Sequence, residues 1–247
     1  MLVDSHCHIN SFPEERIKDI IFQDKEDYLF IDVSIDRDTA AKSLSISGRS
    51  DCVYTSLGFH PFSAQSWRED TVIFYRRLID ENKKIVAIGE VGLDYKSNTG
   101  FNEQRDIFVE FIILAKEYSL PLVVHNRWQD DFILNILDEH FDSYEKIVFH
   151  CFSQDKNFLA RILDKKGHVS FSLNVLRQNK KIKESLGAVS LDNLLLETDS
   201  PYMKVNNIAS SPLDIGKLYD FIAKEKGVPQ ERLCQLVSAN AKRVFAI

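Results

Sequence analysis

The strongest constraint on the fold is a series of eight short apolar runs that alternate with segments of helical periodicity. Hairpin turns do not join successive runs, a pattern typical of parallel strands that are buried on both faces and linked by helices. The predicted strands cover 2–6, 28–34, 52–58, 84–90, 121–125, 146–150, 168–172 and 193–198. The predicted helices cover 14–22, 38–46, 66–82, 102–118, 128–140, 155–165, 178–188 and 213–226. Eight successive βα units predict an α/β fold, a (β/α)8 TIM barrel.

Length and uniform composition predict a single domain. A chain of 247 residues has the ordinary size of a TIM barrel, and no internal repeat or low-complexity segment divides it. A last helix is expected over 229–244, since Pro229 suits a first helical turn. Residues 201–212 lack periodicity and are expected to form a loop at the barrel mouth, beside the active site. We therefore expect one barrel domain over residues 1–247.

Charge and cysteine content narrow the class of protein. The formal net charge of −6 excludes a protein that coats nucleic acid through a globally basic surface, but it leaves room for an enzyme whose bound cations meet phosphates. The four cysteines, Cys7, Cys52, Cys151 and Cys234, form no C-x-x-C pair, which favours a reducing compartment. No signal peptide or apolar run of membrane-spanning length is present, so a cytoplasmic protein without membrane association is expected.

Ionisable side chains stand at five of the predicted strand ends. They are four histidines and two carboxylates: His6, His8, Glu90, His125, His150 and Asp199. Because the carboxyl ends of the strands form the active-site face of a βα barrel, these side chains are expected to converge. Imidazoles and carboxylates suit Mn²⁺ and Zn²⁺, and Mg²⁺ suits a site partly filled by water and phosphate. The sequence therefore predicts a centre for divalent metal ions.

The spacing of these residues supports the metal interpretation. His6 and His8 alternate along a strand and so project to the same side, where both can bind one ion. Glu90 follows a run too apolar for a free carboxylate, and its two oxygens could bridge two ions. For each residue alone a structural hydrogen bond is the competing interpretation, and for Glu90 a place at a loop start. Their joint occurrence favours the metal centre.

Further candidates for substrate contact follow the predicted strands. His60 is a candidate to position a phosphate or shuttle a proton, with a plain turn histidine as the alternative. Arg127 carries a guanidinium that suits phosphate oxygens, with a surface ion pair as the alternative. Lys180 and Lys181 belong to the basic run 177–183, which is a candidate for contact with a nucleic-acid backbone or else a solvated helix face.

Other polar residues are expected to serve the structure only. His140 ends a predicted helix, and His168 opens a predicted strand at the end away from the mouth, so both are expected to be structural or solvated. The chain has no G-x-S-x-G nucleophile motif, no glycine-rich phosphate loop and no dinucleotide fingerprint. Nucleophilic serine or cysteine catalysis and nucleotide cofactors are therefore not expected.

In its ordered motifs the chain resembles the TatD family of metal-dependent deoxyribonucleases, within the amidohydrolase-like barrels. The motifs occupy residues 4–8 (DSHCH), 58–61 (GFHP), 89–95 (GEVGLDY), 120–127 (LPLVVHNR), 150–153 (HCFS) and 197–202 (ETDSPY). The resemblance covers nearly the whole chain. It implies two sets of ligands: His6, His8, Glu90 and Asp199 for one divalent ion, and Glu90, His125 and His150 for a second. It also implies that Glu90 takes the place of a carboxylated lysine.

Two departures from the family pattern affect substrate binding rather than metal binding. Family members usually carry a second histidine after the His-Pro pair, where this chain has Phe62. They also usually carry an Arg-Gly-x-Arg-Asn-x-Pro stretch after the last motif, whereas residues 203–212 contain no arginine.

The leading hypothesis is a phosphodiesterase that hydrolyses DNA, single-stranded or from its ends, by a two-metal mechanism. Asp199 would orient or deprotonate the attacking water, Glu90 would bridge the ions, and His60 would hold the phosphate. One alternative is a hydrolase of a carbonyl substrate such as an amide, a lactone or an aminoacyl ester. Another is a nuclease subunit that needs partner proteins in a multi-gene system. The sequence leaves open the metal, the direction of digestion, the preference for DNA or RNA, and the oligomeric state.

Overall fold

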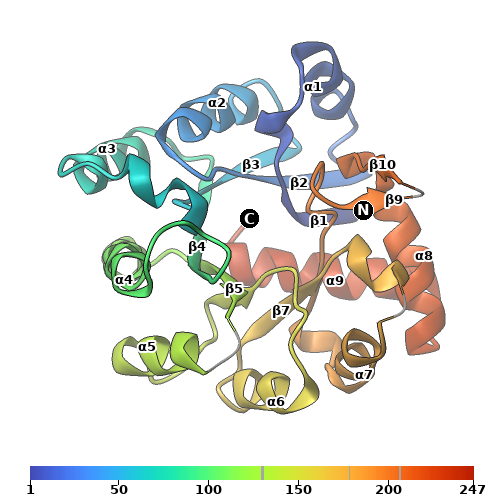
Figure 1. Cartoon of the computed structure of the whole chain (residues 1–247). Coiled ribbons are helices and arrows are strands. Elements are labelled where there is room, and N and C mark those ends of the chain that lie inside the picture. The colour runs from blue at the N-terminus through green and yellow to red at the C-terminus, as the bar shows by residue number, and fades with distance from the viewer. Residues whose placement is uncertain (129–130, 178, 206) are drawn as a thin grey trace.

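The computed structural model describes residues 1–128, 131–177, 179–205 and 207–247, and it confirms the predicted barrel. Eight parallel strands neighbour one another in sequence order, and Figure 1 looks along the axis that they surround. The strands are β1 (Leu2–Cys7), β2 (Tyr28–Val33), β3 (Val53–Leu57), β4 (Ile85–Asp94), β5 (Leu122–Arg127), β6 (Ile147–Phe149), β7 (His168–Phe171) and β8 (Leu194–Leu196).

Helices surround these strands, and the last of them crosses one end of the barrel (Figure 1). They are α1 (Glu14–Ile21), α2 (Arg37–Ser47), α3 (Thr71–Glu81), α4 (Phe101–Glu117), α5 (Phe132–His140), α6 (Lys156–Asp164), α7 (Lys180–Ala188), α8 (Ile215–Lys226) and α9 (Gln230–Phe245). Short 3-10 turns are η1 (Ile9–Ser11), η2 (Pro61–Ser66), η3 (Leu173–Arg177), η4 (Leu191–Asn193) and η5 (Pro212–Asp214). Most predicted elements thus match the observed ones within a few residues.

Hydrogen bonds outside the strand ladder join β1 to the end of β8 and nearly close the barrel. The Ser5 hydroxyl donates to the Leu196 carbonyl over 3.0 Å. The Asp199 amide donates to the His6 carbonyl, also over 3.0 Å. These bonds bring residues of the first and last barrel strands to one point of the barrel mouth.

Helix packing follows the predicted amphipathic pattern. The apolar stripe expected over 102–118 is buried in α4 and consists of Ile107, Phe108, Phe111, Ile112, Leu114 and Ala115. These side chains belong to the large apolar layer between the strands and the outer helices. Burial of one helix face against the sheet is the main favourable contribution of such a helix to folding.

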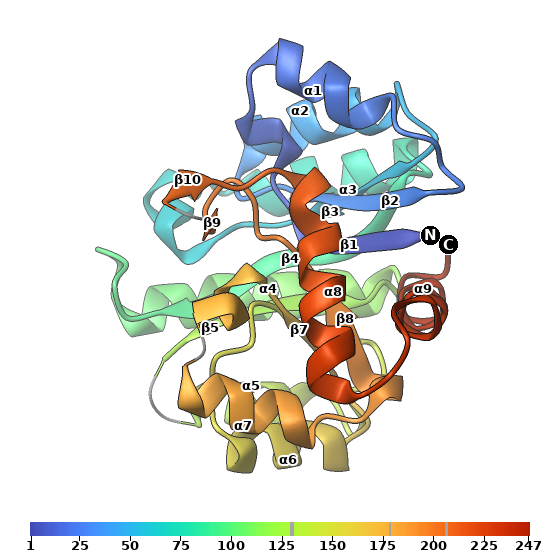
Figure 2. The ribbon, with the colours of Figure 1, turned by 90° about the vertical axis from the view of Figure 1, so that its right-hand side faces the viewer.

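A second apolar layer fills the amino end of the barrel. It contains Val3, Leu29, Ile31, Val33, Val86, Ala87, Val123, Val148, Leu195, Ala241, Val244 and Phe245. The last three belong to α9, which crosses this end of the barrel (Figure 1). Figure 2 shows both chain termini beside α9, at the opposite end from the β9–β10 hairpin (Lys204–Val205 and Ile208–Ala209).

β4 is longer than the prediction of 84–90, because it continues through two glycines to Asp94. Gly89 and Gly92 have φ angles of +140° and +148°, which side-chain-bearing residues rarely adopt. A Cβ atom at Gly92 would lie 2.0 Å from the backbone oxygen of His125. The glycines therefore let β4 run close to β5 and carry both Glu90 and Asp94 to the barrel mouth.

The prediction of an unstructured loop over 201–212 is wrong in part, because the segment contains the antiparallel pair β9 and β10 and the turn η5. Strands of two residues are too short to leave an alternating apolar pattern in the sequence, and they pair only when the hairpin that joins them folds. Residue 206 lies outside the described residues.

The predicted helix starts are also wrong at two places. The helix expected over 66–82 begins at Thr71, because Pro61–Ser66 forms the separate turn η2. The helix expected over 128–140 begins at Phe132, and residues 129–130 lie outside the described residues. Residue 178 of the helix predicted over 178–188 also lies outside them.

Two further expectations concern the chain as a whole. Among the described residues, no helix combines the length and apolar composition needed to cross a bilayer. The four cysteines are free thiols.

Candidate metal centre

The barrel brings the six predicted metal ligands together, and Glu90 lies between them. Its Oε2 atom is 3.3 Å from His6 Nε2 and 3.7 Å from His8 Nε2. Its Oε1 atom is 2.7 Å from both His125 Nδ1 and His150 Nε2. The two oxygens of one carboxylate therefore face two different pairs of histidines.

Asp199 completes the group on the β1 side. Its Oδ1 atom is 3.5 Å from His8 Nε2, and the Nε2 atoms of His6 and His8 are 3.3 Å apart. One donor atom from each of these three residues lies within 4.8 Å of the others. This set has the spacing of ligands around one cation.

Hydrogen bonds at the outer ring nitrogens direct lone pairs into the cluster. His8 Nδ1 donates to the Val33 carbonyl over 2.9 Å, so the neutral ring presents the lone pair of Nε2. His125 Nε2 donates to Asp94 Oδ2 over 2.9 Å, so the neutral ring presents the lone pair of Nδ1. The lone pair of His8 faces Glu90 Oε2 and Asp199 Oδ1, and that of His125 faces Glu90 Oε1. A cation or added protons must neutralise such an arrangement of lone pairs and carboxylate oxygens. The donor set therefore fits divalent metal ions.

The electrostatics of the cluster also favour the binding of a cation or of protons. Burial alone would raise the pKa of the Glu90 carboxyl, but the charge of His150 and hydrogen bonds from His125 and His150 outweigh it and hold this pKa well below its ordinary value. Burial lowers the pKa of His150, yet Glu90 and Glu197 overcome that effect and raise it well above its ordinary value. Glu90 is only 3% exposed, so bulk water does little to stabilise its charge. Its neighbours, or a bound cation, must do so.

His60 differs from the other histidines of the mouth. Burial lowers the pKa of its imidazole to about 3, so the ring is neutral at neutral pH. Its Nδ1 atom accepts a hydrogen bond from the Phe62 amide over 3.1 Å, which places the proton of the neutral ring on Nε2. That Nε2 atom lies 3.4 Å from Glu90 Oε1. His60 thus presents a hydrogen-bond donor to the centre.

Two carboxylates behind the cluster were missed as functional residues. Asp94 accepts from His125, and Glu197 Oε1 lies 3.4 Å from His150 Nδ1. Glu197 also accepts from the Cys151 amide over 2.8 Å and from the Ser170 hydroxyl, and is fully buried. Asp94 orients His125 through its hydrogen bond, and Glu197 places a carboxylate beside the His150 ring. The available signal was a carboxylate at the end of a buried strand, the same signal that identified Glu90 and Asp199.

Asp4 supports the junction between the first and last strands. Its Oδ1 atom accepts from the Thr198 amide over 2.9 Å, and the Thr198 hydroxyl lies 2.6 Å from its Oδ2 atom. Burial raises the pKa of the Asp4 carboxyl to about 8. Asp4 thereby holds the backbone just before Asp199 against the β1 strand that carries His6 and His8.

The predicted phosphate contacts lie at different distances from the centre. Arg127 ends β5 with a half-exposed side chain whose Nη1 atom is 3.8 Å from Asp94 Oδ2. Lys181 contacts Gln154 Oε1 over 3.2 Å at the start of α7. Lys180 is 91% exposed and lies 3.9 Å from Glu184. Arg127 therefore stands beside the cluster, and the two lysines lie on the surface of α7.

His140 and His168 lie outside the cluster. The His140 carbonyl at the end of α5 accepts from the Lys116 ammonium over 2.8 Å. His168 opens β7 at the amino end of the barrel and is 5% exposed. Both residues therefore lie apart from the six predicted ligands.

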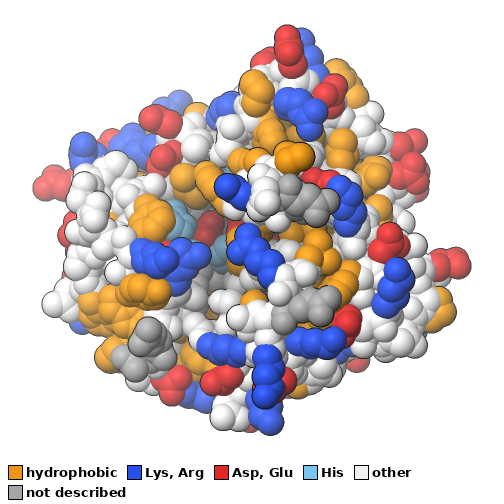
Figure 3. Space-filling model, turned by 45° about the vertical axis from the view of Figure 1, so that its right-hand side comes forward, with side chains coloured by type: hydrophobic (Ala, Val, Ile, Leu, Met, Phe, Trp, Pro, Cys, Tyr) orange, Lys and Arg blue, Asp and Glu red, His pale blue; other side chains and the backbone are white. Residues whose placement is uncertain are grey.

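The surface around the cluster is hollowed. Figure 3 shows histidine and acidic side chains at the bottom of a hollow, with lysine and arginine side chains along its margin. Although the chain as a whole carries a net charge of −6, cationic groups thus gather around the entrance to the acidic and imidazole cluster.

A βα barrel with a buried cluster of imidazoles and carboxylates at the carboxyl ends of its strands defines a metal-dependent hydrolase. This chain belongs to the TatD family of such hydrolases, since the family model described as TatD related DNase matches residues 3–246. The family predicted from the six motifs is thereby confirmed.

Individual relatives agree with this assignment. The chain is 29% identical over 255 residues to YabD of Bacillus subtilis (strain 168), an uncharacterized metal-dependent hydrolase, and the match covers 100% of both chains. It is 28% identical over 207 residues to TatD of Pantoea ananatis (strain LMG 20103), a 3'-5' ssDNA/RNA exonuclease, and covers 80% of this chain and 79% of that one. The crystal structure of YJJV, a TatD homologue from Escherichia coli K12, has the same fold, with a TM-score of 0.88, 23% identity and coverage of 100% and 98%.

Proposed function

We propose that this chain, as one catalytic domain over residues 1–247, hydrolyses phosphodiester bonds of DNA from strand ends with two divalent metal ions. The observation that carries the proposal is the division of the ligands by Glu90. One carboxylate oxygen faces His6 and His8, and the other faces His125 and His150. A carboxylate so placed can bridge two cations, the arrangement that two-metal hydrolysis of phosphodiesters requires.

The residues that would hold the ions are the six predicted ligands. His6, His8, Asp199 and Glu90 Oε2 would bind one ion, and His125, His150 and Glu90 Oε1 the other. When bound, Mg²⁺, Mn²⁺ or Zn²⁺ would polarise the phosphate and lower the pKa of a coordinated water. The nearby Asp94 and Glu197 would keep the ring nitrogens of His125 and His150 directed inward.

Asp199 is the proposed proton acceptor. Burial opposes its ionisation, but hydrogen bonding with His8 and the charges of nearby histidines lower the pKa of this carboxyl below its ordinary value. The ionised carboxylate can orient the attacking water and take its proton.

His60 and Arg127 are the proposed phosphate contacts. The Nε2 proton of the neutral His60 ring can donate to a phosphate oxygen as charge develops. The half-exposed Arg127 guanidinium at the mouth can contact a second oxygen. Lys180 and Lys181 on α7 would meet phosphates further along the strand.

Two observations support a nucleic-acid substrate. The relative from Pantoea ananatis is a 3'-5' ssDNA/RNA exonuclease. Lysine and arginine side chains surround the hollow above the cluster (Figure 3), where they can meet a polyanion in spite of the acidic balance of the whole chain. A single-stranded end can enter such a hollow more readily than the middle of a duplex.

The test is digestion of end-labelled single-stranded DNA by the purified protein with Mg²⁺, Mn²⁺ or Zn²⁺. Stepwise shortening of the labelled strand by the wild type is expected, and the label position reveals the direction. A Glu90→Ala/Asp199→Ala double variant purified in parallel excludes contaminating nucleases.

Absence of cleavage by a metal-loaded, folded wild type would contradict the proposal. Screening the same preparation against amides, lactones and aminoacyl esters would then identify a carbonyl substrate. Activity that depends on added partner proteins would instead indicate a subunit of a larger system.

A further inference from the structure

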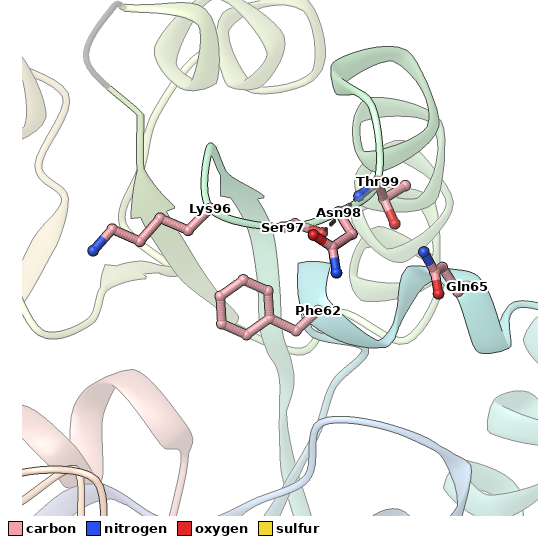
Figure 4. A pocket seen from close by; sticks show the side chains of 6 residues that line it. All are labelled: Phe62, Gln65, Lys96, Ser97, Asn98 and Thr99. Atoms are coloured by element: carbon pink, nitrogen blue, oxygen red, sulfur yellow. Dashed lines mark hydrogen bonds between the residues drawn. The ribbon is translucent and has the colours of Figure 1, made fainter.

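A surface pocket lies beside the metal centre and contributes none of the ligands discussed above. Its volume is about 290 Å³, at the lower end of the range of roughly 300–1,000 Å³ for small-molecule sites. Its lining consists of Phe62, Gln65, Lys96, Ser97, Asn98 and Thr99. Figure 4 shows these side chains on two loops, one that follows His60 after β3 and one that follows Asp94 after β4.

Hydrogen bonds tie both loops to each other and to the centre. The Ser97 hydroxyl donates to the Pro61 carbonyl over 2.9 Å and joins the two walls. The Lys96 amide donates over 2.8 Å to the Asp94 carboxylate that also holds His125. Gln104 in α4 donates to the Thr99 carbonyl over 2.7 Å. The pocket therefore has a defined position relative to the reacting groups.

Phe62 is the aromatic wall of this pocket. Its side chain is 55% exposed, although most large apolar side chains of a folded domain gain free energy from burial. Its ring stands edge to face with the His60 ring, with 5.0 Å between the ring centroids. An exposed aromatic face next to the His60 donor is available to a flat ring of a ligand.

The remaining lining selects against a cationic ligand. Among the described residues, none of those that line the pocket is a carboxylate, and Lys96 supplies a positive charge. The side chains of Gln65, Asn98 and Thr99 offer both hydrogen-bond donors and acceptors. The pocket thus combines an aromatic face, neutral polar groups and one cation.

We infer that this pocket is a nucleobase subsite, in which Phe62 stacks on a base of the strand being cleaved and Lys96 contacts a phosphate next to that base. The inference rests on the proposed nuclease function. It also gives a role to the position at which the sequence departs from the family pattern, because a phenylalanine in place of a histidine exchanges a polar contact for a stacking surface. Stacking on an aromatic side chain tolerates any base, since every base has a π face.

The experiment measures kcat/KM on single-stranded hexanucleotides with one abasic residue placed at each position in turn. Wild type is compared with Phe62→Ala, with Phe62→Leu, which keeps apolar bulk without a flat π face, and with Phe62→Trp. Phe22→Ala is the matched control, because Phe22 is 75% exposed at the end of α1. Thermal unfolding verifies that each variant is folded.

Removal of Phe62 should lower kcat/KM only when the oligonucleotide carries a nucleobase at the position that stacks on Phe62. Phe62→Ala and Phe62→Leu should lower kcat/KM on the intact oligonucleotide roughly 5- to 150-fold, the usual effect of losing one stacked base, while Phe62→Trp and Phe22→Ala keep it near the wild-type value. On the oligonucleotide that is abasic at one particular position, Phe62→Ala should cause no further loss.

Other outcomes overturn the inference. Equal loss on intact and all abasic oligonucleotides would show that Phe62 only positions His60, and no loss at all would show that the pocket is not used. A wild type that cleaves none of the oligonucleotides would refute the nuclease proposal itself, a result distinct from both.

Discussion

The two ends of the barrel are built from the same eight strands but bury opposite kinds of side chain. At the amino end, aliphatic residues of the strands and α9 form a dry apolar layer. At the carboxyl end, the same strands bury imidazoles and carboxylates that face one another within a few ångströms. The apolar end stabilises the fold, whereas the polar end is tolerable only if its charges are compensated.

Two buried histidines, one at each end of the barrel, illustrate this difference. His150 lies between Glu90 and Glu197 and has its pKa raised, in spite of burial. His168, at the amino end, has its pKa lowered to about 4 by burial and by the nearby Arg243. A buried histidine therefore indicates the functional site only when carboxylates face it.

The largest effect is expected from Asp199→Asn at the polar end. Loss of the proton acceptor should lower kcat by roughly 10²- to 10⁴-fold, the usual contribution of a general base. The free energy of unfolding should fall only slightly, because the lost interaction of the carboxylate with His8 is partly offset by removal of a buried charge. Steady-state kinetics and denaturant unfolding of the same preparation check both parts, and activity within tenfold of wild type would remove Asp199 from this role.

Phe245→Ala at the apolar end should lower the free energy of unfolding and leave kcat unchanged. Phe245 is 2% exposed in the amino-end layer, and its truncation should lower the free energy of unfolding by about 3–5 kcal/mol. The kcat of the folded fraction should not change, because the side chain lies at the other end of the barrel from Asp199. A lowered kcat with an unchanged free energy of unfolding would show that the two ends of the barrel do not have separate roles.

Glu197→Gln tests the support behind the metal ligands. The amide keeps the size of the side chain but removes the negative charge beside His150, and metal affinity should fall roughly 10- to 100-fold. Titration of the metal-stripped variant with Mn²⁺ measures the change. Glu184→Gln, on the exposed surface of α7, is the matched control. Equal Kd values for Glu197→Gln and wild type would show that Glu197 serves folding alone.

The smallest effect concerns His168 and pH. The folded state takes up this proton near pH 4, whereas the unfolded chain does so near 6.5, so the unfolded state binds more protons between these values. Stability should therefore fall as the pH is lowered from 6.5 towards 4. His168→Gln should show a shallower fall in denaturant unfolding over this range. An identical slope would mean that His168 does not titrate in this way.

Local sequence predicted the strands and the positions of the clustered histidines and carboxylates well, because burial on both faces and position at a strand end are local properties. Val123 and Val124 of β5 are apolar on both faces of the sheet, and His125 follows them directly. The pairing of His125 with Asp94, by contrast, depends on the register between β4 and β5. No periodicity within one segment encodes that register, so the continuation of β4 beyond Glu90 was missed.

The central claim is that Glu90 bridges two metal ions, and titration of the metal-stripped protein with Mn²⁺ tests it most directly. Electron paramagnetic resonance reports both the number of bound ions and their magnetic coupling. The account predicts two Mn²⁺ per wild-type chain with a coupled signal, and loss of the coupling and of at least one ion in folded Glu90→Ala. A single ion in the wild type, or two coupled ions in Glu90→Ala, would contradict it.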